Sequence, residues 1–185
     1  MIIITIPEKR FWNEVTNEFI TTKECKLSLE HSLVSISKWE SKWHKPFLSD
    51  EIKTQEETVY YIKCMTLTQN VDSLIYSALT NKNLIDVKKY IDNKMTATWF
   101  SEPKMGAAQK PVKKEVITSE LIYYWMISLE IPFECQKWHL NRLLTLIKVC
   151  NAKAKSANKK GNKRDTLSRN AELNAARRNQ LGTSG

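Results

Sequence analysis

Cysteine and histidine are the side chains of this sequence that could hold a metal ion, and one pair has a suitable spacing. Cys135 and His139 stand four positions apart, so on a helix both would point from one face, as two zinc ligands can. No second pair is spaced in this way, and Cys25 and His31 would have to be brought in by the fold. We interpret Cys135 as a small core residue and His139 as a helix-surface or hydrogen-bonded residue, and expect no metal or other cofactor.

Nucleophilic catalysis and nucleotide binding lack their usual signatures. The sequence has no Gly-x-Ser-x-Gly turn, and no cysteine lies in a recognisable catalytic context. Its four glycines form no glycine-rich phosphate loop. The adjacent Glu56 and Glu57 would point apart on a helix, where they are better explained as first-turn charges that favour the helix dipole. We therefore predict no catalytic residues and a protein that is not an enzyme.

Positive charge is concentrated at the C-terminal end. Residues 151–185 hold nine basic and two acidic side chains, and so contribute +7 to a net charge of +9. This segment has no aromatic residue and few large aliphatic ones, so it cannot bury enough apolar area to offset the entropy lost on ordering. We predict a mostly helical globular domain at residues 1–150 and a flexible basic tail at residues 151–185, mobile or helical only when bound.

Two short strands are expected near the N-terminus. Ile2–Ile6 is β-branched and is followed by proline, and Glu24–Leu29 alternates apolar and polar residues with the period of a half-buried strand. Between them Phe11, Val15 and Phe19 recur every four residues, a spacing that favours a short amphipathic helix.

The rest of the domain is predicted to be helical, which makes the fold mainly α. Thr54 and Glu57 form a capping-box pattern at one helix start. Ser101–Glu115 has the composition of a loop, and its flanks, Ala97–Phe100 and Val116–Thr118, could pair as a small β-ribbon. Helices are expected within residues 30–46 and at about residues 55–66, 74–78, 83–91, 119–130 and 132–153.

The expected compartment is a reducing cytosol. The four cysteines stand far apart, without the paired spacing of a disulfide framework. Ile2–Ile6 is too short for the core of a signal peptide. The longest apolar run, Leu121–Leu129, is less than half the length of a bilayer crossing, so it is predicted to be a buried helix and no membrane contact is expected.

Two regions are candidates for partner binding. Trp39 and Trp43 lie four positions apart in a polar stretch, so on a helix they could anchor a partner surface. The tail could bind nucleic acid through phosphate contacts, or it could dock on an acidic protein surface. The lack of any base-stacking ring in the tail favours the second alternative. Its candidate residues are Lys159, Lys160, Lys163, Arg164, Arg169, Arg177 and Arg178.

Two stretches, Glu30–Glu40 and Leu121–Leu144, resemble small proteins of tailed bacteriophages. Together with the short N-terminal β segment, a late helix start at Ile131-Pro132-Phe133-Glu134 and the basic C-terminus, they are similar to the tail-assembly chaperones of long-tailed phages. The resemblance covers residues 1–153 loosely and carries over no functional residue. It implies a non-catalytic protein of the bacterial host cytoplasm that coats the tape-measure protein, helps to recruit tail-tube subunits and often forms a homo-oligomer. A phage neck or connector component, or a phage nucleic-acid-binding protein, would have a similar composition.

Overall fold

The computed structural model describes residues 1–13, 17–98, 100, 116–161 and 163–181. The chain divides into two compact units, Met1–Thr145 and Leu146–Gly185. Helices predominate over four short strands in the described residues, as the mainly α prediction requires. The predicted loop at Ser101–Glu115 lies outside the described residues. No helix within the described ranges combines the length and the apolar character needed to cross a membrane.

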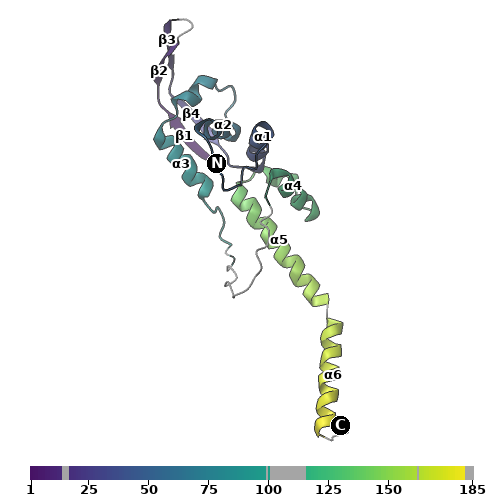
Figure 1. Ribbon diagram of the computed structural model, residues 1–185. Helices are drawn as coiled ribbons and strands as arrows, with labels where there is room; N and C mark the ends of the chain where they lie inside the picture. Colours follow the sequence, from purple (N-terminus) through teal and green to yellow (C-terminus); the bar gives the residue numbers. More distant parts are fainter. Residues whose placement is uncertain (14–16, 99, 101–115, 162, 182–185) are drawn as a thin grey trace. The chain divides into compact units, whose positions relative to one another are not determined.

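The two predicted N-terminal strands are confirmed as an antiparallel pair. Strand β1 (Ile2–Ile6) lies beside β4 (Cys25–Leu29), with Ile4 opposite Leu27 (Figure 1). Alternate side chains of both strands point to the same face, because successive side chains in a strand point to opposite faces. The residues that this face buries in the core are Ile4, Ile6, Leu27 and Leu29.

The segment between these strands is a hairpin, and the predicted helix is wrong. Strands β2 (Lys9–Asn13) and β3 (Glu18–Thr22) pair antiparallel. Trp12 and Phe19 stand opposite each other with ring centroids 4.9 Å apart in an edge-to-face contact. Asn17 has a positive φ of 53°, which asparagine tolerates better than most residues. Cross-strand aromatic pairing next to a turn therefore outweighs the four-residue spacing of apolar residues.

The helices predicted in the middle of the chain are confirmed with small changes at their ends. Thr54 Oγ1 accepts a hydrogen bond from the Glu57 N–H at 3.2 Å, and the Glu57 carboxylate accepts one from the Thr54 N–H at 2.8 Å. Capping boxes also start two other helices, at Ser32 and Thr80, where serine and asparagine replace the usual glutamate. The helices are α1 (Leu33–Trp43), α2 (Gln55–Met65), η1 (Ser73–Ala78, a 3₁₀ helix), α3 (Asn81–Asp92) and α4 (Ser119–Ser128).

The helix predicted from Pro132 onward is broken in two. A 3₁₀ helix, η2 (Phe133–Lys137), ends before α5 (Leu140–Gly161) begins. Between them His139 forms an antiparallel bridge with Ser32. A continuous helix is excluded here because the extended backbone is held to a segment far away in the sequence.

The predicted β-ribbon is also wrong within the described residues. Ala97, Thr98, Phe100 and Val116–Thr118 belong to no strand. Thr118 instead caps α4, since its side chain accepts a hydrogen bond from the Leu121 N–H. Thr118 is therefore the N-cap of α4, and this helix begins at the position that the sequence predicts.

The described part of the basic tail is helical. It consists of the C-terminal part of α5 and of α6 (Lys163–Leu181). Leu167 and Leu173 of α6 are exposed. Their exposure accords with a segment that has few apolar residues to bury.

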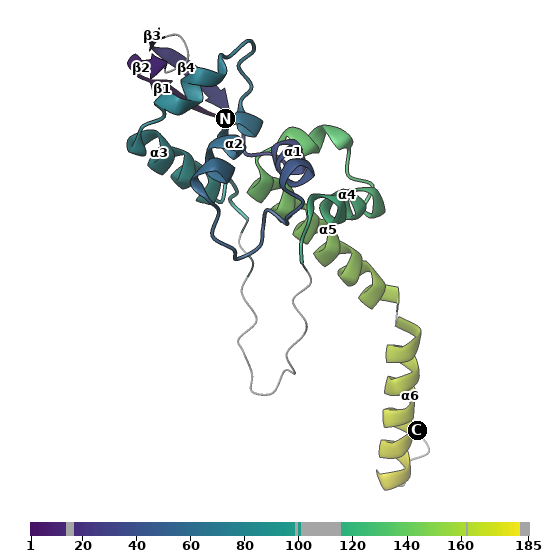
Figure 2. The same ribbon diagram turned by 45° about the horizontal axis from the view of Figure 1, so that its top comes forward.

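An aromatic cluster forms the centre of the first unit. Phe47 and Tyr61 have ring centroids 4.0 Å apart, and Trp39 meets Phe47 edge-on at 5.1 Å. These residues come from α1, α2 and the loop between them. The cluster fixes α1 against α2, and α3 lies beside β1 in both Figure 1 and Figure 2.

Candidate partner-binding surfaces

Trp39, one of the two predicted partner anchors, is a core residue. Its side chain is 1% exposed, and its indole N–H donates a hydrogen bond to the Glu57 carbonyl at 2.9 Å. Its ring also contacts Phe47. The expectation that Trp39 faces a partner is corrected, because this side of α1 packs on α2.

Trp43, the other predicted anchor, is half-buried at the end of α1. Its ring lies 6.3 Å from that of Tyr60, and Lys42 Nζ lies 5.1 Å from the Trp43 centroid and 4.1 Å from the Tyr60 centroid. Among the described residues, Trp43 Nε1 is a buried side-chain atom with no hydrogen-bond partner. Of the two indoles, Trp43 is the one that still presents part of its ring to solvent.

Glu40 explains why this polar stretch is buried on one side, although Ser41 and Lys42 are exposed. Its side chain is buried, with Oε1 accepting a hydrogen bond from the Phe47 N–H at 2.8 Å. Oε2 accepts one from the Ser119 N–H, also at 2.8 Å. The carboxylate thus joins α1 to the following loop and to the first turn of α4, whose N–H groups favour a negative charge.

Of the four residues considered for a metal site, only the two histidines lie together, and each has a hydrogen-bond partner of its own. His31 and His139 are both buried, with ring centroids 5.0 Å apart. His31 Nδ1 lies 2.5 Å from the Tyr61 hydroxyl, and His139 Nε2 lies 3.0 Å from the Tyr90 carbonyl oxygen. Cys135 is buried in η2. Within the described residues, no three histidine, cysteine or acidic side chains gather as metal ligands would.

Burial keeps this cluster uncharged. It lowers the pKa of His31 from 6.5 to about 3, and the neighbouring His139 adds a smaller lowering. Burial also lowers the pKa of His139, although its hydrogen bond to the Tyr90 carbonyl acts the other way. Burial raises the pKa of Tyr61, so the hydroxyl keeps its proton and can donate to His31 Nδ1. These contacts tie the end of β4, α2 and the start of α5 together, which is a structural role.

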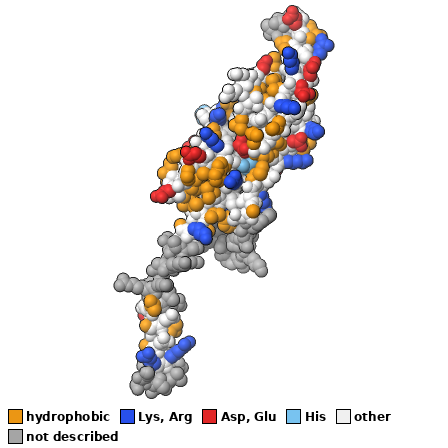
Figure 3. Space-filling model, turned by 180° about the vertical axis from the view of Figure 1, so that it is seen from behind, with side chains coloured by type: hydrophobic (Ala, Val, Ile, Leu, Met, Phe, Trp, Pro, Cys, Tyr) orange, Lys and Arg blue, Asp and Glu red, His pale blue; other side chains and the backbone are white. Residues whose placement is uncertain are grey.

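An exposed apolar surface lies on α4 and the start of η2. Tyr124 and Ile127 are 62% and 61% exposed, and Phe133 is 53% exposed. Tyr124 and Ile127 are three positions apart, so they share one face of α4. The exposed Pro132 precedes Phe133. We call these four residues the α4–η2 surface, and Figure 3 shows hydrophobic side chains gathered over α4.

The α4–η2 surface arises because α4 is apolar on both sides. Ile122 and Met126 of the same helix are fully buried, so the prediction of a buried helix is correct for the inner face only. The Tyr123 hydroxyl donates to Gln136 Oε1 at 2.9 Å, which holds η2 against α4. Sequence reasoning missed the outer face, although an apolar helix of ten residues at the edge of a domain is a signal for it.

The basic candidate residues belong to the two C-terminal helices. Arg177 and Arg178 are exposed on α6. Side chains of the remaining candidates lie outside the described residues, and only their positions in helices are known. Lys159 and Lys160 belong to α5, and Lys163, Arg164 and Arg169 belong to α6.

Comparison with known proteins gives no relative. No protein-family model, no curated protein and no solved structure matches this chain.

Proposed function

We propose that this protein is a non-enzymatic binding protein of bacteriophage tail assembly that holds an apolar face of a partner on the α4–η2 surface. The observation that carries the proposal is the exposure of Tyr124, Ile127 and Phe133. Contiguous apolar surface on a folded domain commonly marks a site of protein interaction. Aromatic side chains supply much of the binding energy at such sites.

The size of the α4–η2 surface favours many weak contacts over one tight contact. Three half-exposed side chains present roughly 100 Å² each, worth about 2.5 kcal/mol apiece when buried. Their sum, of order 7 kcal/mol, is comparable with the roughly 4–15 kcal/mol of freedom that association costs. A single copy would therefore bind weakly. Several copies along one elongated client would hold it firmly, because linked binding events raise the effective concentration.

The proposed client is the tape-measure protein or a tail-tube subunit, in the host cytoplasm. The resemblance to tail-assembly chaperones supports this choice, and a long client coated by many copies suits the weak single contact. A homo-oligomer would increase the number of linked contacts further. Residues 151–185, with nine basic and two acidic side chains, would add electrostatic attraction to an acidic partner.

The alternative is a phage nucleic-acid-binding protein that uses the same basic segment. It is favoured by the charge of residues 151–185 and by the exposure of Arg177 and Arg178. Such binding would weaken steeply with salt, because each phosphate contact releases counterions. A neck or connector component is a further structural alternative with the same surfaces.

Co-purification with tail proteins tests the proposal. The double variant Tyr124→Ser, Ile127→Ser removes the apolar face of α4, and Ile85→Ser removes an exposed apolar residue from α3 as the matched control. Tagged protein is co-expressed with the tape-measure and tail-tube proteins of its phage. We expect capture of a tail protein by the native chain and the control, and its loss with the double variant at unchanged unfolding temperature.

Deletion of residues 151–185 separates the two candidate functions. The tail-assembly proposal expects capture of the tail protein to persist through the α4–η2 surface, with reduced yield. Salt-sensitive retention on DNA that disappears with the deletion, together with no captured tail protein, would overturn the proposal in favour of nucleic-acid binding.

A further inference from the structure

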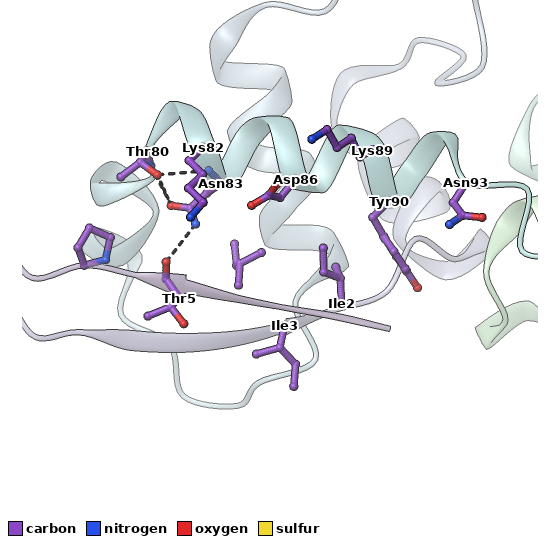
Figure 4. Close-up of a pocket in the computed structure, with 12 residues that line it drawn as sticks. Ile2, Ile3, Thr5, Thr80, Lys82, Asn83, Asp86, Lys89, Tyr90 and Asn93 are labelled. Atoms are coloured by element: carbon purple, nitrogen blue, oxygen red, sulfur yellow. Dashed lines mark hydrogen bonds between the residues drawn. The ribbon is translucent and has the colours of Figure 1, made fainter.

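A groove of about 660 Å³ between β1 and α3 is already occupied on its strand side by the packing of α3. Asn83 Nδ2 donates to the Thr5 carbonyl at 3.0 Å, so α3 covers the outward edge of β1 (Figure 4). The exposed Lys82 and Lys89 have Asp86 between them on α3. Within the described residues, this groove therefore has no open strand edge and little net charge.

A second groove, of about 520 Å³, lies between α1 and α2 and has a different character. The residues that line it, three from each helix, are Ser37, Lys38, Ser41, Tyr60, Lys63 and Cys64. Lys38 and Lys63 are exposed, whereas Tyr60 and Cys64 are half-buried. Among the described residues, none of those that line it is acidic. We call it the α1–α2 groove.

Lys42 adds a third positive charge beside the α1–α2 groove. Its Nζ lies 4.1 Å from the centroid of the Tyr60 ring, which lines the groove. Burial raises the pKa of the Cys64 thiol. Three charges act to lower this pKa, and they are those of Lys38, Lys42 and Lys63. Because a charge acts on the thiol more strongly the closer it lies, the three ammonium groups converge on the part of the groove that holds Cys64.

The helices that carry these lysines do not balance their charge. No acidic residue stands three or four positions from any of the three lysines, which are the spacings at which side chains pair on a helix. Lys38 and Lys42 are themselves four positions apart, where two like charges repel. The ion pairs of the described residues use Glu30 and Glu57, and neither includes one of these lysines. The helix dipole favours a cation in the last turn, where Lys42 and Lys63 lie, but not at Lys38 in the middle of α1.

We propose that the α1–α2 groove binds an acidic helical segment of a partner protein. A helix laid in a groove of its partner is a common mode of recognition. Because Lys38 and Lys42 are one turn apart, carboxylates one turn apart on the partner helix would meet them in succession. Lys63 would meet a carboxylate from the opposite wall. The hydroxyls of Ser37 and Ser41, also one turn apart, can donate to the same carboxylates.

Nucleic acid fits the α1–α2 groove less well than an acidic helix does. Among the described residues, Tyr60 is the one aromatic residue that lines the groove, and Lys42 already covers a face of its ring. A base therefore lacks a free ring on which to stack. Residues 1–150 carry a net charge of only +2, because residues 151–185 contribute +7 of the +9. The positive charge is thus local to the groove and does not extend as the basic stripe that follows a phosphate backbone.

A library of alanine-based helical peptides, randomised along one face, supplies the probe. It is selected on the native full-length chain and counter-selected on the double variant Lys38→Gln, Lys63→Gln. The counter-selection removes peptides that bind only through residues 151–185, because the variant keeps that basic segment. The double variant Lys82→Gln, Lys89→Gln is the matched control, since it removes the same charge from exposed positions on α3. A selected peptide is then titrated into each protein by fluorescence anisotropy.

The proposal expects selected peptides with glutamate or aspartate spaced one helical turn apart. Loss of Lys38 and Lys63 should weaken binding by about tenfold, the effect of two charge pairs at exposed sites. The control variant should bind as the native chain does. The same peptide with glutamine in place of each glutamate, and asparagine in place of each aspartate, should fail to bind the native chain, a result that does not depend on any variant folding.

Cys64 gives a second measurement on the native chain. Its half-buried thiol lines the groove, so a bound helix should slow its alkylation by the uncharged reagent N-ethylmaleimide. Cys25 and Cys150 are also half-buried but do not line the groove, and their alkylation should stay unchanged. Mass spectrometry of proteolytic fragments follows all three cysteines in one sample.

Four results would overturn the proposal. They are a library without enrichment of acidic peptides, equal weakening by the groove and control variants, equal alkylation of Cys64 with and without the peptide, and a single-stranded oligonucleotide that protects Cys64 better than the peptide does. The fourth result would make nucleic acid the occupant. None of them bears on the α4–η2 surface, because no residue of that surface lines the groove.

Discussion

Acid should destabilise this protein through His31, and the size of the effect follows from burial. The pKa of His31 is about 3 in the folded chain and 6.5 in the unfolded chain. Between these values the unfolded chain binds one more proton at this site, so stability is fully present above about pH 6.5 and is lost as the pH falls. One proton corresponds to about 1.4 kcal/mol per pH unit. Acidification to pH 4.5 should therefore cost about 3 kcal/mol from His31.

The surroundings of His31 offer no compensation for its charge. Tyr61 stands at Nδ1 as a neutral hydroxyl, and the Ser35 hydroxyl lies 3.3 Å from the Tyr61 oxygen. The ring of Phe47 lies 6.4 Å away. His139, at 5.0 Å, would repel a charged His31, and its own pKa is lowered by burial, so it titrates in the same destabilising direction.

Urea unfolding at pH 7.5 and pH 4.5 measures this effect. In His31→Asn an amide oxygen can still accept from Tyr61, but the titrating group is gone. His44→Asn is the matched control, because His44 is exposed and its positive φ of 52° suits asparagine. We expect His31→Asn to be less stable at pH 7.5 and to lose about 3 kcal/mol less on acidification than the native chain and the control. An equal loss in all three proteins would refute the argument from burial.

Two substitutions test the buried side of α1 by urea unfolding at neutral pH. Glu40→Gln keeps the shape but replaces one acceptor oxygen with a donor, so one of two buried backbone N–H groups loses its partner at a cost of about 1–3 kcal/mol. The exposed Glu56→Gln is its control and should change little; equal effects would contradict the structure. Trp39→Phe removes the indole hydrogen bond and part of a buried ring, which should cost about 2–4 kcal/mol, and Trp43→Phe should cost less because its N–H has no partner to lose. The reverse order would show that Trp39 is not the core residue.

Features with a local cause could be predicted from the sequence. The β-branched run of β1, the alternation of β4 and the capping box at Thr54 depend on residues within a few positions of one another, and the structure contains all three elements. The hairpin of β2 and β3 could not be predicted from spacing, because Trp12 and Phe19 pair across a turn. The four-residue spacing of apolar residues predicted a helix in this segment, whereas pairing across the turn formed a hairpin.

The candidate surfaces depended on the fold to a greater extent. The sequence around Trp39 and Glu40 predicts a polar, exposed stretch. The Glu40 carboxylate is nevertheless buried in the core, where the Ser119 N–H, 79 positions away, donates a hydrogen bond to it. The exposure of Tyr124 also depended on the fold, because no neighbouring residue distinguishes the outer face of α4 from its inner face.

By itself the sequence determined strands β1 and β4, the capped start of α2 and the location of the positive charge, because each follows from neighbouring residues. Only the tertiary structure decided that His31 meets His139, that α3 lies against β1, and that α4 leaves one apolar face uncovered. These features depend on which distant segments pack together, and packing is a property of the whole chain that no local pattern contains.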